Sequence, residues 1–280
     1  MEAAERVTAD ADFYAEHGYL LVRSVFGAAE VEEMRDAIAR ILDGVSGTAY
    51  DRNHTWRDAA PGKAEAKQLQ LKGFHDLIYH DGVFTRMVAH PRLVAVLTQL
   101  IGPNVQLHHT KMLVKPPEQG APFPMHQDYP YFPHERHSVL AASVHLDDTD
   151  EENGCLHVVP GSHRLGPLEA QGESKTLAFG TTSGDLSPDL VQAAAGDVLF
   201  FNYLTIHGSG VNRSTRTRRN VLFQYRDPAD PPLLRDGVEE HVDWGAGTMV
   251  AGSNPAFWSW RSRLHIEQRK TAEKVRPERL

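Results

Sequence analysis

The stretch GDVLFFNYLTIHGSG, residues 196–210, joins the clearest strand pattern of the chain to a histidine beside glycine. Its apolar run, 198–204, is rich in aromatic side chains and predicts a buried β-strand over 197–203. Similar short runs stand at 105–115, 139–146, 155–159, 175–179 and 220–226, with Asn153-Gly154 and Pro160-Gly161 as turn signals between them. Many short strands separated by polar turns predict a β-sandwich or a barrel.

The first hundred residues are predicted to be mainly helical, with one strand at 19–22. Apolar residues at helical spacing predict a helix over 31–42, ended by Gly44, and a second helix that begins at Pro91 and ends at Gly102-Pro103. Residues 44–68 are polar and interrupted by glycine and proline, so they are expected to form a long surface loop, either a lid or a disordered segment. The tail after 227 contains Trp244, Phe257, Trp258 and Trp260 and is expected to pack on the barrel.

Composition excludes several classes of function. The chain of 280 residues has 41% apolar and 24% charged residues, which is ordinary for a globular protein. Its formal charge of −8 disfavours nucleic acid and anionic membranes as partners. No apolar run reaches the roughly 18 residues of a membrane span, and no secretory signal is visible. The single cysteine, Cys155, excludes an internal disulfide. These features predict a cytoplasmic protein.

Three His-x-Asp pairs offer metal ligands, at 126–128, 145–147 and 241–243. Two histidines and one carboxylate on one face of a metal form the triad of non-haem Fe(II) oxygenases. The third pair has only His265 downstream and no strand pattern, and the second lies inside a probable core strand, although spacing alone does not exclude it. The first pair follows a proline-rich loop at a strand entrance. The context therefore favours His126 and Asp128, with His207 as the third ligand.

Arg218 follows His207 by eleven residues, beyond a turn at 212–214 and near the start of the strand 220–226. An antiparallel return would bring its guanidinium beside the metal, where it can bind a carboxylate with two parallel hydrogen bonds. The alternative is that Arg218 belongs, with its arginine neighbours, to a solvated basic turn.

At these residues the sequence resembles the phytanoyl-CoA dioxygenase family of Fe(II)/2-oxoglutarate enzymes, over roughly residues 10–226. The resemblance is specific because several motifs agree in type and order: Gly102-Pro103-Asn104-Val105, His109-Thr110 with Lys115-Pro116-Pro117, His126-Gln127-Asp128 with Tyr131-Phe132-Pro133, Asn153-Gly154-Cys155-Leu156 with Pro160-Gly161-Ser162-His163, and Gly196-Asp197-Val198 leading to His207-Gly208-Ser209-Gly210.

The resemblance implies a mainly β fold with flanking helices around a double-stranded β-helix, the cupin-like jelly roll. One catalytic domain over 1–280 would then comprise a helical part (1–104), the jelly-roll core with the metal site (105–226) and a C-terminal extension (227–280). The resemblance also implies that His126, Asp128 and His207 bind Fe(II), and that Arg218 and Ser209 bind 2-oxoglutarate. Lys72 falls near a family lysine of the co-substrate pocket, and is either a pocket residue or a surface lysine.

The implied reaction is hydroxylation of an unactivated C–H of a small molecule with O2, releasing succinate and CO2. Desaturation or cyclisation by the same chemistry is the alternative. Asp128 argues against halogenation, because related halogenases lack this carboxylate. Two further readings remain: a non-catalytic jelly-roll binding protein, and a cupin that uses Mn or Fe with three histidines and a glutamate. A nucleic-acid demethylase is disfavoured by the net charge.

Two departures from the family pattern concern the substrate. Ser143 stands where relatives often have tryptophan, and Lys111 stands where some have methionine facing the co-substrate. If Ser143 faces the pocket, strand alternation places His145 on the same side, either as a core histidine or as a substrate contact. A pocket with these side chains would be more polar than a long acyl-CoA requires. The residues after the triad pair form either a pocket wall or part of the core: Tyr129, Tyr131 and Phe132. The sequence does not indicate which substrate is used or which oligomer forms.

Overall fold

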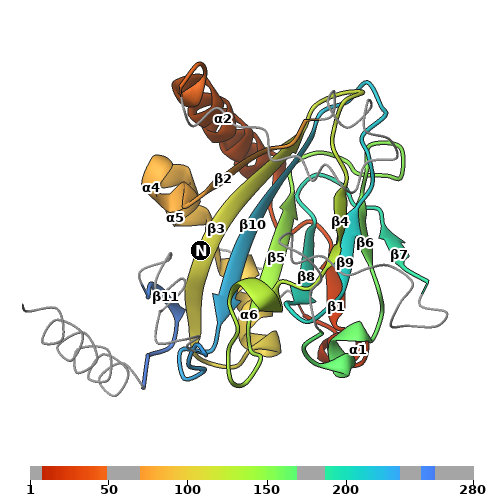
Figure 1. Ribbon diagram of the computed structural model, residues 1–280. Coiled ribbons are helices and arrows are strands. Elements are labelled where there is room, and N and C mark those ends of the chain that lie inside the picture. The colour runs from red at the N-terminus through yellow and green to blue at the C-terminus, as the bar shows by residue number, and fades with distance from the viewer. Residues whose placement is uncertain (1–7, 49–69, 169–186, 234–246, 256–280) are drawn as a thin grey trace, which may run out of the picture.

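The computed structural model describes residues 8–48, 70–168, 187–233 and 247–255. Two antiparallel sheets face each other, and helices cover the outer side of the larger one (Figure 1). The larger sheet has the order β1-β8-β5-β10-β3-β11, with β2 also paired to β3, and the smaller sheet has the order β4-β9-β6-β7. This is the jelly-roll arrangement that the family resemblance implied.

The strands are short except for the two that run through the centre of the large sheet, β3 and β10. Their bounds are β1 Tyr19–Val22, β2 Lys72–His75, β3 Val105–Lys115, β4 Phe123–His126, β5 Leu140–His145, β6 Leu156–Val158, β7 Asp189–Val191, β8 Val198–Asn202, β9 His207–Ser209, β10 Arg218–Arg226 and β11 Met249–Ala251.

The helices lie mostly before the first long strand. They are α1 Ala11–His17, α2 Ala28–Val45, α4 Leu77–His80, α5 Gly82–Met87 and α6 Pro91–Leu100, with 3-10 turns η2 Tyr129–Tyr131 and η3 Ser162–Leu165. Local signals fix their starts: the Asp10 carboxylate accepts from the Phe13 N–H at 2.9 Å, and Pro91 begins α6. Among the described helices, none is long and apolar enough to cross a bilayer.

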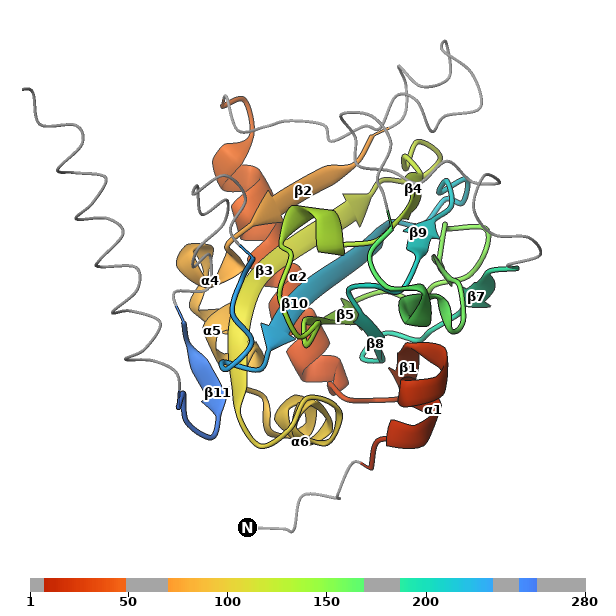
Figure 2. The same ribbon diagram turned by 60° about the horizontal axis from the view of Figure 1, so that its bottom comes forward.

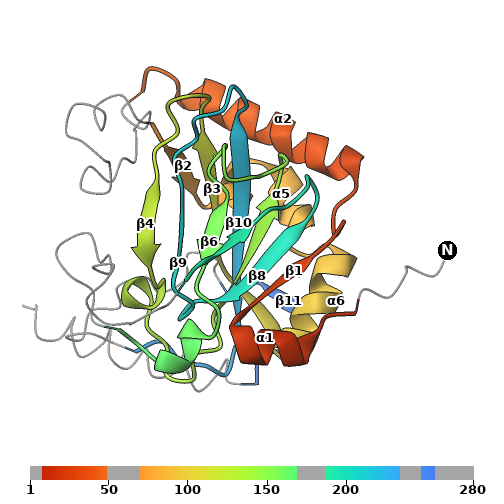
Figure 3. The same cartoon turned by 90° about the vertical axis from the view of Figure 1, so that its right-hand side faces the viewer.

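Period-two alternation divides every central strand between the two faces of the large sheet. In β10, Val221 and Phe223 join the main core beneath the helices, while Leu222 packs toward the smaller sheet. Helix α2 crosses the outer face of the sheet (Figure 2). Its Met34 and Ile38 are fully buried in the main core. One face of the large sheet therefore packs against the helices in the main apolar core. The opposite face is directed toward the smaller sheet (Figure 3).

Most predicted elements are confirmed. The strands at 19–22, 105–115, 139–146, 155–159, 197–203 and 220–226 correspond to β1, β3, β5, β6, β8 and β10, and the two helices to α2 and α6. Helix α2 continues past Gly44 to Val45, and β2 interrupts the part expected to be helical. In the tail, β11 pairs with β3. The predicted strand 175–179, most of the loop 44–68 and the four tail aromatics lie outside the described residues.

Candidate active site

Two neighbouring strands of the smaller sheet bring the predicted triad together. His126 ends β4 and lies directly opposite His207, which begins β9. Asp128 follows two residues later and its N–H donates to the Tyr203 carbonyl at 2.9 Å. Its Oδ1 lies 3.4 Å from His126 Nε2 and 3.8 Å from His207 Nε2. All three ligand atoms lie within 4.8 Å of one another, which suits one metal ion.

The second nitrogen of each histidine is fixed by the backbone. His126 Nδ1 donates to the Pro124 carbonyl at 2.9 Å, and His207 Nδ1 donates to the Thr205 carbonyl at the same distance. These bonds leave the Nε2 lone pairs directed at the space beside Asp128. Gln224 on β10 donates from Nε2 to the outer carboxylate oxygen of Asp128 at 2.7 Å. The donor set and its supporting bonds therefore fit a ferrous ion.

Electrostatics keep Asp128 and His207 in the states that bind metal. Burial alone would raise the pKa of Asp128, but the neighbouring imidazoles of His207 and His126 hold that pKa below its ordinary value. Burial, with the nearby His126, lowers the pKa of His207 to about 4. At neutral pH the site thus offers one carboxylate and a neutral His207 imidazole.

Gly208 allows the two ligand-bearing strands to approach. A Cβ at this position would lie 2.8 Å from the Phe123 carbonyl oxygen and 2.7 Å from the Met125 sulfur. Any side chain at 208 would therefore push β4 away from β9.

Two buried basic side chains lie beyond the triad. Arg218 begins β10 opposite Lys115 at the end of β3. Their side chains are 4% and 2% exposed. Lys115 Nζ donates to Ser209 Oγ at 2.8 Å and to the Gly210 carbonyl. Within the described part of the chain neither side chain has a carboxylate partner, and Arg218 Nε has no hydrogen-bond partner.

Such burial is unfavourable unless an anion completes the site. Burial lowers the pKa of Arg218 to about 10, so the guanidinium remains charged at neutral pH. The arrangement fits the distal carboxylate of a dicarboxylate.

Two connected cavities meet at the triad. The smaller, about 50 Å³, extends to Ser209 and Arg218, and the larger, about 360 Å³, opens on the other side toward β2 and η2. Six residues line both: Lys111, Leu113, Phe123, His126, Asp128 and Leu222. A metal at the triad would therefore contact a co-substrate in one cavity and a substrate in the other.

The remaining predicted site residues divide into two groups. Tyr131 and Phe132 line the larger cavity and Ser143 the smaller one. Burial, with the nearby Asp128, raises the pKa of Tyr131 to about 12, so its phenol stays protonated.

Lys72, Tyr129 and His145 line neither cavity. Tyr129 packs edge-on against Tyr203, with 5.6 Å between the ring centroids. Gly73 and His75 of β2 line the larger cavity, so strand alternation directs the side chain of Lys72 to the other face. His145 is fully buried on the face that Ser143 shares. A pocket role for these three therefore gains no support from the geometry.

Sequence reasoning missed Lys115 and Gln224 as site residues, together with three histidines of the larger cavity, His75, His108 and His109. The available signal was strand alternation. Lys115 lies on the same face of β3 as Lys111, and Gln224 lies on the same face of β10 as Arg218. Alternation alone does not show which face of a strand lines the cavity, so it did not identify Lys115 and Gln224 as site residues.

The comparisons with known proteins agree with this geometry. The family model for phytanoyl-CoA dioxygenase matches residues 14–220. A probable alpha-ketoglutarate-dependent hypophosphite dioxygenase of Stutzerimonas stutzeri is 30% identical over 253 residues, covering 87% of this chain and 86% of the relative. A probable phytanoyl-CoA dioxygenase of Caenorhabditis elegans is 31% identical over 232 residues, covering 76% and 73%.

A solved structure of similar fold is the alpha-ketoglutarate-dependent epimerase SnoN from nogalamycin biosynthesis. It superimposes with a TM-score of 0.66 at 26% identity, covering 85% of this chain and 87% of SnoN.

The fold and site thus define a jelly-roll enzyme of the 2-oxoglutarate-dependent dioxygenase class. Within that class, the chain belongs to the phytanoyl-CoA dioxygenase family.

Proposed function

We propose that this enzyme uses Fe(II), 2-oxoglutarate and O2 to hydroxylate an unactivated C–H of a small-molecule substrate, with release of succinate and CO2. One observation carries the proposal. The triad of two histidines and one carboxylate lines the same small cavity as Arg218, a buried guanidinium without a carboxylate partner among the described residues. A cupin that uses a metal without a co-substrate would need three histidines and a glutamate, whereas this site has two histidines and an aspartate. Such an enzyme would also give Arg218 no ligand to bind.

Each part of the site has a distinct role in this proposal. His126, Asp128 and His207 hold the ferrous ion, which with 2-oxoglutarate and O2 supplies the oxidising chemistry. Arg218 binds the distal carboxylate of 2-oxoglutarate together with the Ser209 hydroxyl.

The other side chains of the smaller cavity support these roles. Lys115 fixes the orientation of Ser209 by donating a hydrogen bond to its hydroxyl. Leu113, Phe123, Phe201 and Leu222 form apolar walls that limit water around the reacting centre.

A small substrate is favoured over a long acyl thioester. The larger cavity, about 360 Å³ among the described residues, is at the lower end of ordinary small-molecule sites. Relatives named for hypophosphite and for phytanoyl-CoA differ greatly in substrate size, so the name of a relative does not select one.

We also propose that residues 1–280 form one catalytic domain that works in the cytoplasm without a nucleic-acid partner. The pairing of β11 with β3 supports a tail that returns to the core. The net charge of −8 supports the last point.

The test is an Fe(II)-dependent 2-oxoglutarate turnover screen over carboxylic acids, amino acids, phosphonates and acyl thioesters, with succinate as the readout. Once a substrate is found, Arg218→Met should raise the KM for 2-oxoglutarate by about 30-fold or more, because removing one partner of a buried charge pair costs about 2–5 kcal/mol.

Arg219→Met is the matched control. Arg219 is the next residue on β10 but faces the other side, where it pairs with Asp147 at 2.7 Å. Equal effects of the two substitutions on that KM would reject the assignment of Arg218. Absence of succinate formation with every substrate class would count against the function itself.

A further inference from the structure

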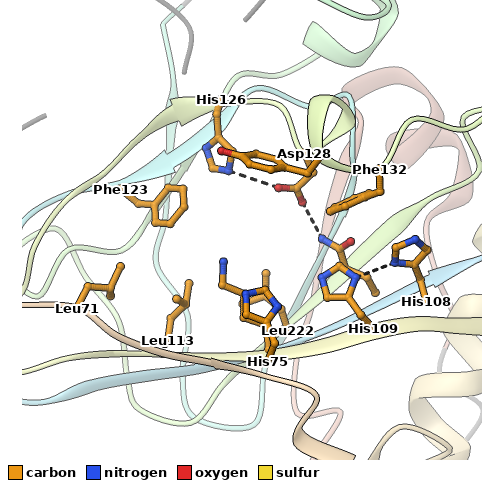
Figure 4. A pocket seen from close by; sticks show the side chains of 14 residues that line it. Leu71, His75, His108, His109, Leu113, Phe123, His126, Asp128, Phe132 and Leu222 are labelled. Carbon is orange, nitrogen blue, oxygen red and sulfur yellow. Dashed lines mark hydrogen bonds and ion pairs between the residues drawn. The ribbon is translucent and has the colours of Figure 1, made fainter. Parts of the chain in front are cut away.

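Lys111 lies on the large sheet, across the cavities from the metal ligands. It pairs in register with Leu222 on β10 and with His75 on β2, so it belongs to the interior of that sheet. Figure 4 shows Leu222 on the opposite side of the larger cavity from His126 and Asp128. Because Lys111 lines both cavities, its amino group enters the site from the sheet that carries no metal ligand.

An aromatic ring on the smaller sheet holds this amino group beside the triad. Nζ of Lys111 lies 5.4 Å from the centroid of the Phe123 ring, within the range of a cation–π interaction. The same ring packs against the His126 imidazole, with 4.7 Å between the centroids. Over the residues that the structure describes, no hydrogen bond or ion pair involves the Lys111 amino group. The contact with Phe123 therefore positions the amino group but leaves its N–H donors without an acceptor.

The only counter-charge of Lys111 is also the anionic metal ligand. Burial lowers the pKa of Lys111, but the Asp128 carboxylate opposes that change and stabilises the ammonium form. Asp128 is the only carboxylate among the described residues that line the two cavities. A ferrous ion held by Asp128 more than offsets this negative charge, so the ion and the ammonium group then repel each other.

The smaller cavity has a basic side chain at each end of the strands that line it. Arg218 pairs in register with Lys115, and Lys111 lies four residues before Lys115 on β3. About 13 Å of strand therefore separates the backbone of Arg218 from that of Lys111. Both Arg218 and Lys111 line this cavity. A dicarboxylate carries one anionic group at each end, so it can accept hydrogen bonds from the guanidinium at one end and from the ammonium group at the other.

Resting on the function proposed above, we propose that Lys111 binds the carboxylate of 2-oxoglutarate that lies beside the metal, while Arg218 binds the distal carboxylate. The same ammonium group opposes the binding of Fe(II) when the co-substrate is absent. Lys111 thus strengthens the binding of 2-oxoglutarate at the expense of the affinity for iron alone.

Two binding constants test this role without turnover. The Kd for Fe(II) is measured anaerobically without 2-oxoglutarate, by competition with a chromophoric chelator. The Kd for 2-oxoglutarate is measured by calorimetry on the iron-loaded enzyme. Lys111→Met removes the charge and keeps an unbranched side chain. It should lower the Kd for Fe(II) about ten-fold and raise the Kd for 2-oxoglutarate about ten-fold, because one unit charge acts on both ligands in a partly buried site.

Three further variants separate the effect of charge from that of structure. Lys111→Arg keeps the charge and should not bind Fe(II) more tightly than the wild type. Lys111→Gln is neutral and repeats the measurement should the methionine variant fail to fold. Arg219→Met is the matched control, because it removes a positive charge from the opposite face of the same sheet, where Arg219 pairs with Asp147. Both constants should stay at their wild-type values in that control.

Opposite changes in the two constants are the expected result, since damage to the fold would weaken the binding of both ligands. Weaker binding of both by Lys111→Met, or an unchanged affinity for iron, would overturn the inference. An unchanged affinity for 2-oxoglutarate would also overturn it and would assign the ammonium group to the substrate instead. Tighter iron binding by Lys111→Arg would show that charge is not the cause.

The wild type separates this inference from the proposed function. A wild-type enzyme that binds Fe(II) and 2-oxoglutarate, with a Lys111→Met variant that lacks the opposite changes, refutes only the role of Lys111. A wild-type enzyme that does not bind 2-oxoglutarate refutes the function.

Discussion

The hydrogen bond from Gln224 to Asp128 should control how tightly the metal is held. It is 2.7 Å long, both partners are buried, and its acceptor is a charged carboxylate. A hydrogen bond to a charged group contributes about 1.5–3 kcal/mol, and loss of an outer partner of a metal ligand typically weakens metal binding about 10- to 100-fold. At about 1.4 kcal/mol per factor of ten, the two ranges agree.

Gln224→Leu is the informative change, because leucine fills a similar volume without donating. The Oε1 atom of Gln224 is buried and has no partner among the described residues, so its removal also relieves an unsatisfied polar atom. The metal-free variant should lose at most about 1.5–3 kcal/mol of stability, because Asp128 Oδ2 loses its donor while the unsatisfied Oε1 atom is removed, and its Kd for Fe(II) should rise about 10- to 100-fold.

The assay is an anaerobic competition titration of Fe(II) against a chromophoric chelator, with thermal unfolding of the metal-free protein beside it. Gln99→Leu is the control, because Gln99 hydrogen-bonds the Ala9 N–H and the Ala95 carbonyl far from the triad. A Gln224 variant with wild-type iron affinity would refute the reasoning that this bond orients Asp128.

Two further predictions concern buried charge. Lys115→Met removes the donor that fixes the Ser209 hydroxyl, so the Kd for 2-oxoglutarate should rise about ten-fold in calorimetry at unchanged iron affinity; an unaltered Kd would make Lys115 merely structural. Burial, with the charge of Arg218, lowers the pKa of His145 to about 3, whereas an unfolded histidine titrates near 6.5. The unfolded chain therefore takes up this proton first, and the associated stability, complete above about pH 6.5, is lost as the pH falls toward 3. Below pH 6, the free energy of unfolding of the metal-free wild type, measured with urea, should fall with decreasing pH more steeply than that of His145→Leu, by up to about 1.4 kcal/mol per pH unit. Parallel plots of unfolding free energy against pH for the two proteins would contradict this.

Linear motifs explain why so much of the site could be predicted from sequence. Only Gln127 separates His126 from Asp128, and one strand and one turn join His207 to Arg218, so local patterns placed them. Long strands such as β3 and β10 were equally visible, because many alternating residues contribute to one signal.

What escaped prediction depends on pairing between distant strands. β2, β4 and β9 are three or four residues long, and their sequences KGFH, FPMH and HGS lack the β-branched residues that mark strands. The inward turn of His108 results from a register shift against β10, which neither strand encodes alone. Lys115 could be recognised only when its strand was seen to face Ser209.

An anaerobic titration of the protein with Fe(II) and 2-oxoglutarate, followed in the visible range, tests the central claim most directly. The wild type should develop a weak charge-transfer band that saturates at one iron and one 2-oxoglutarate per chain, and His126→Ala and His207→Ala should abolish it. A wild-type protein that gives no band, or either histidine variant that gives it at full strength, would contradict the assignment of this site.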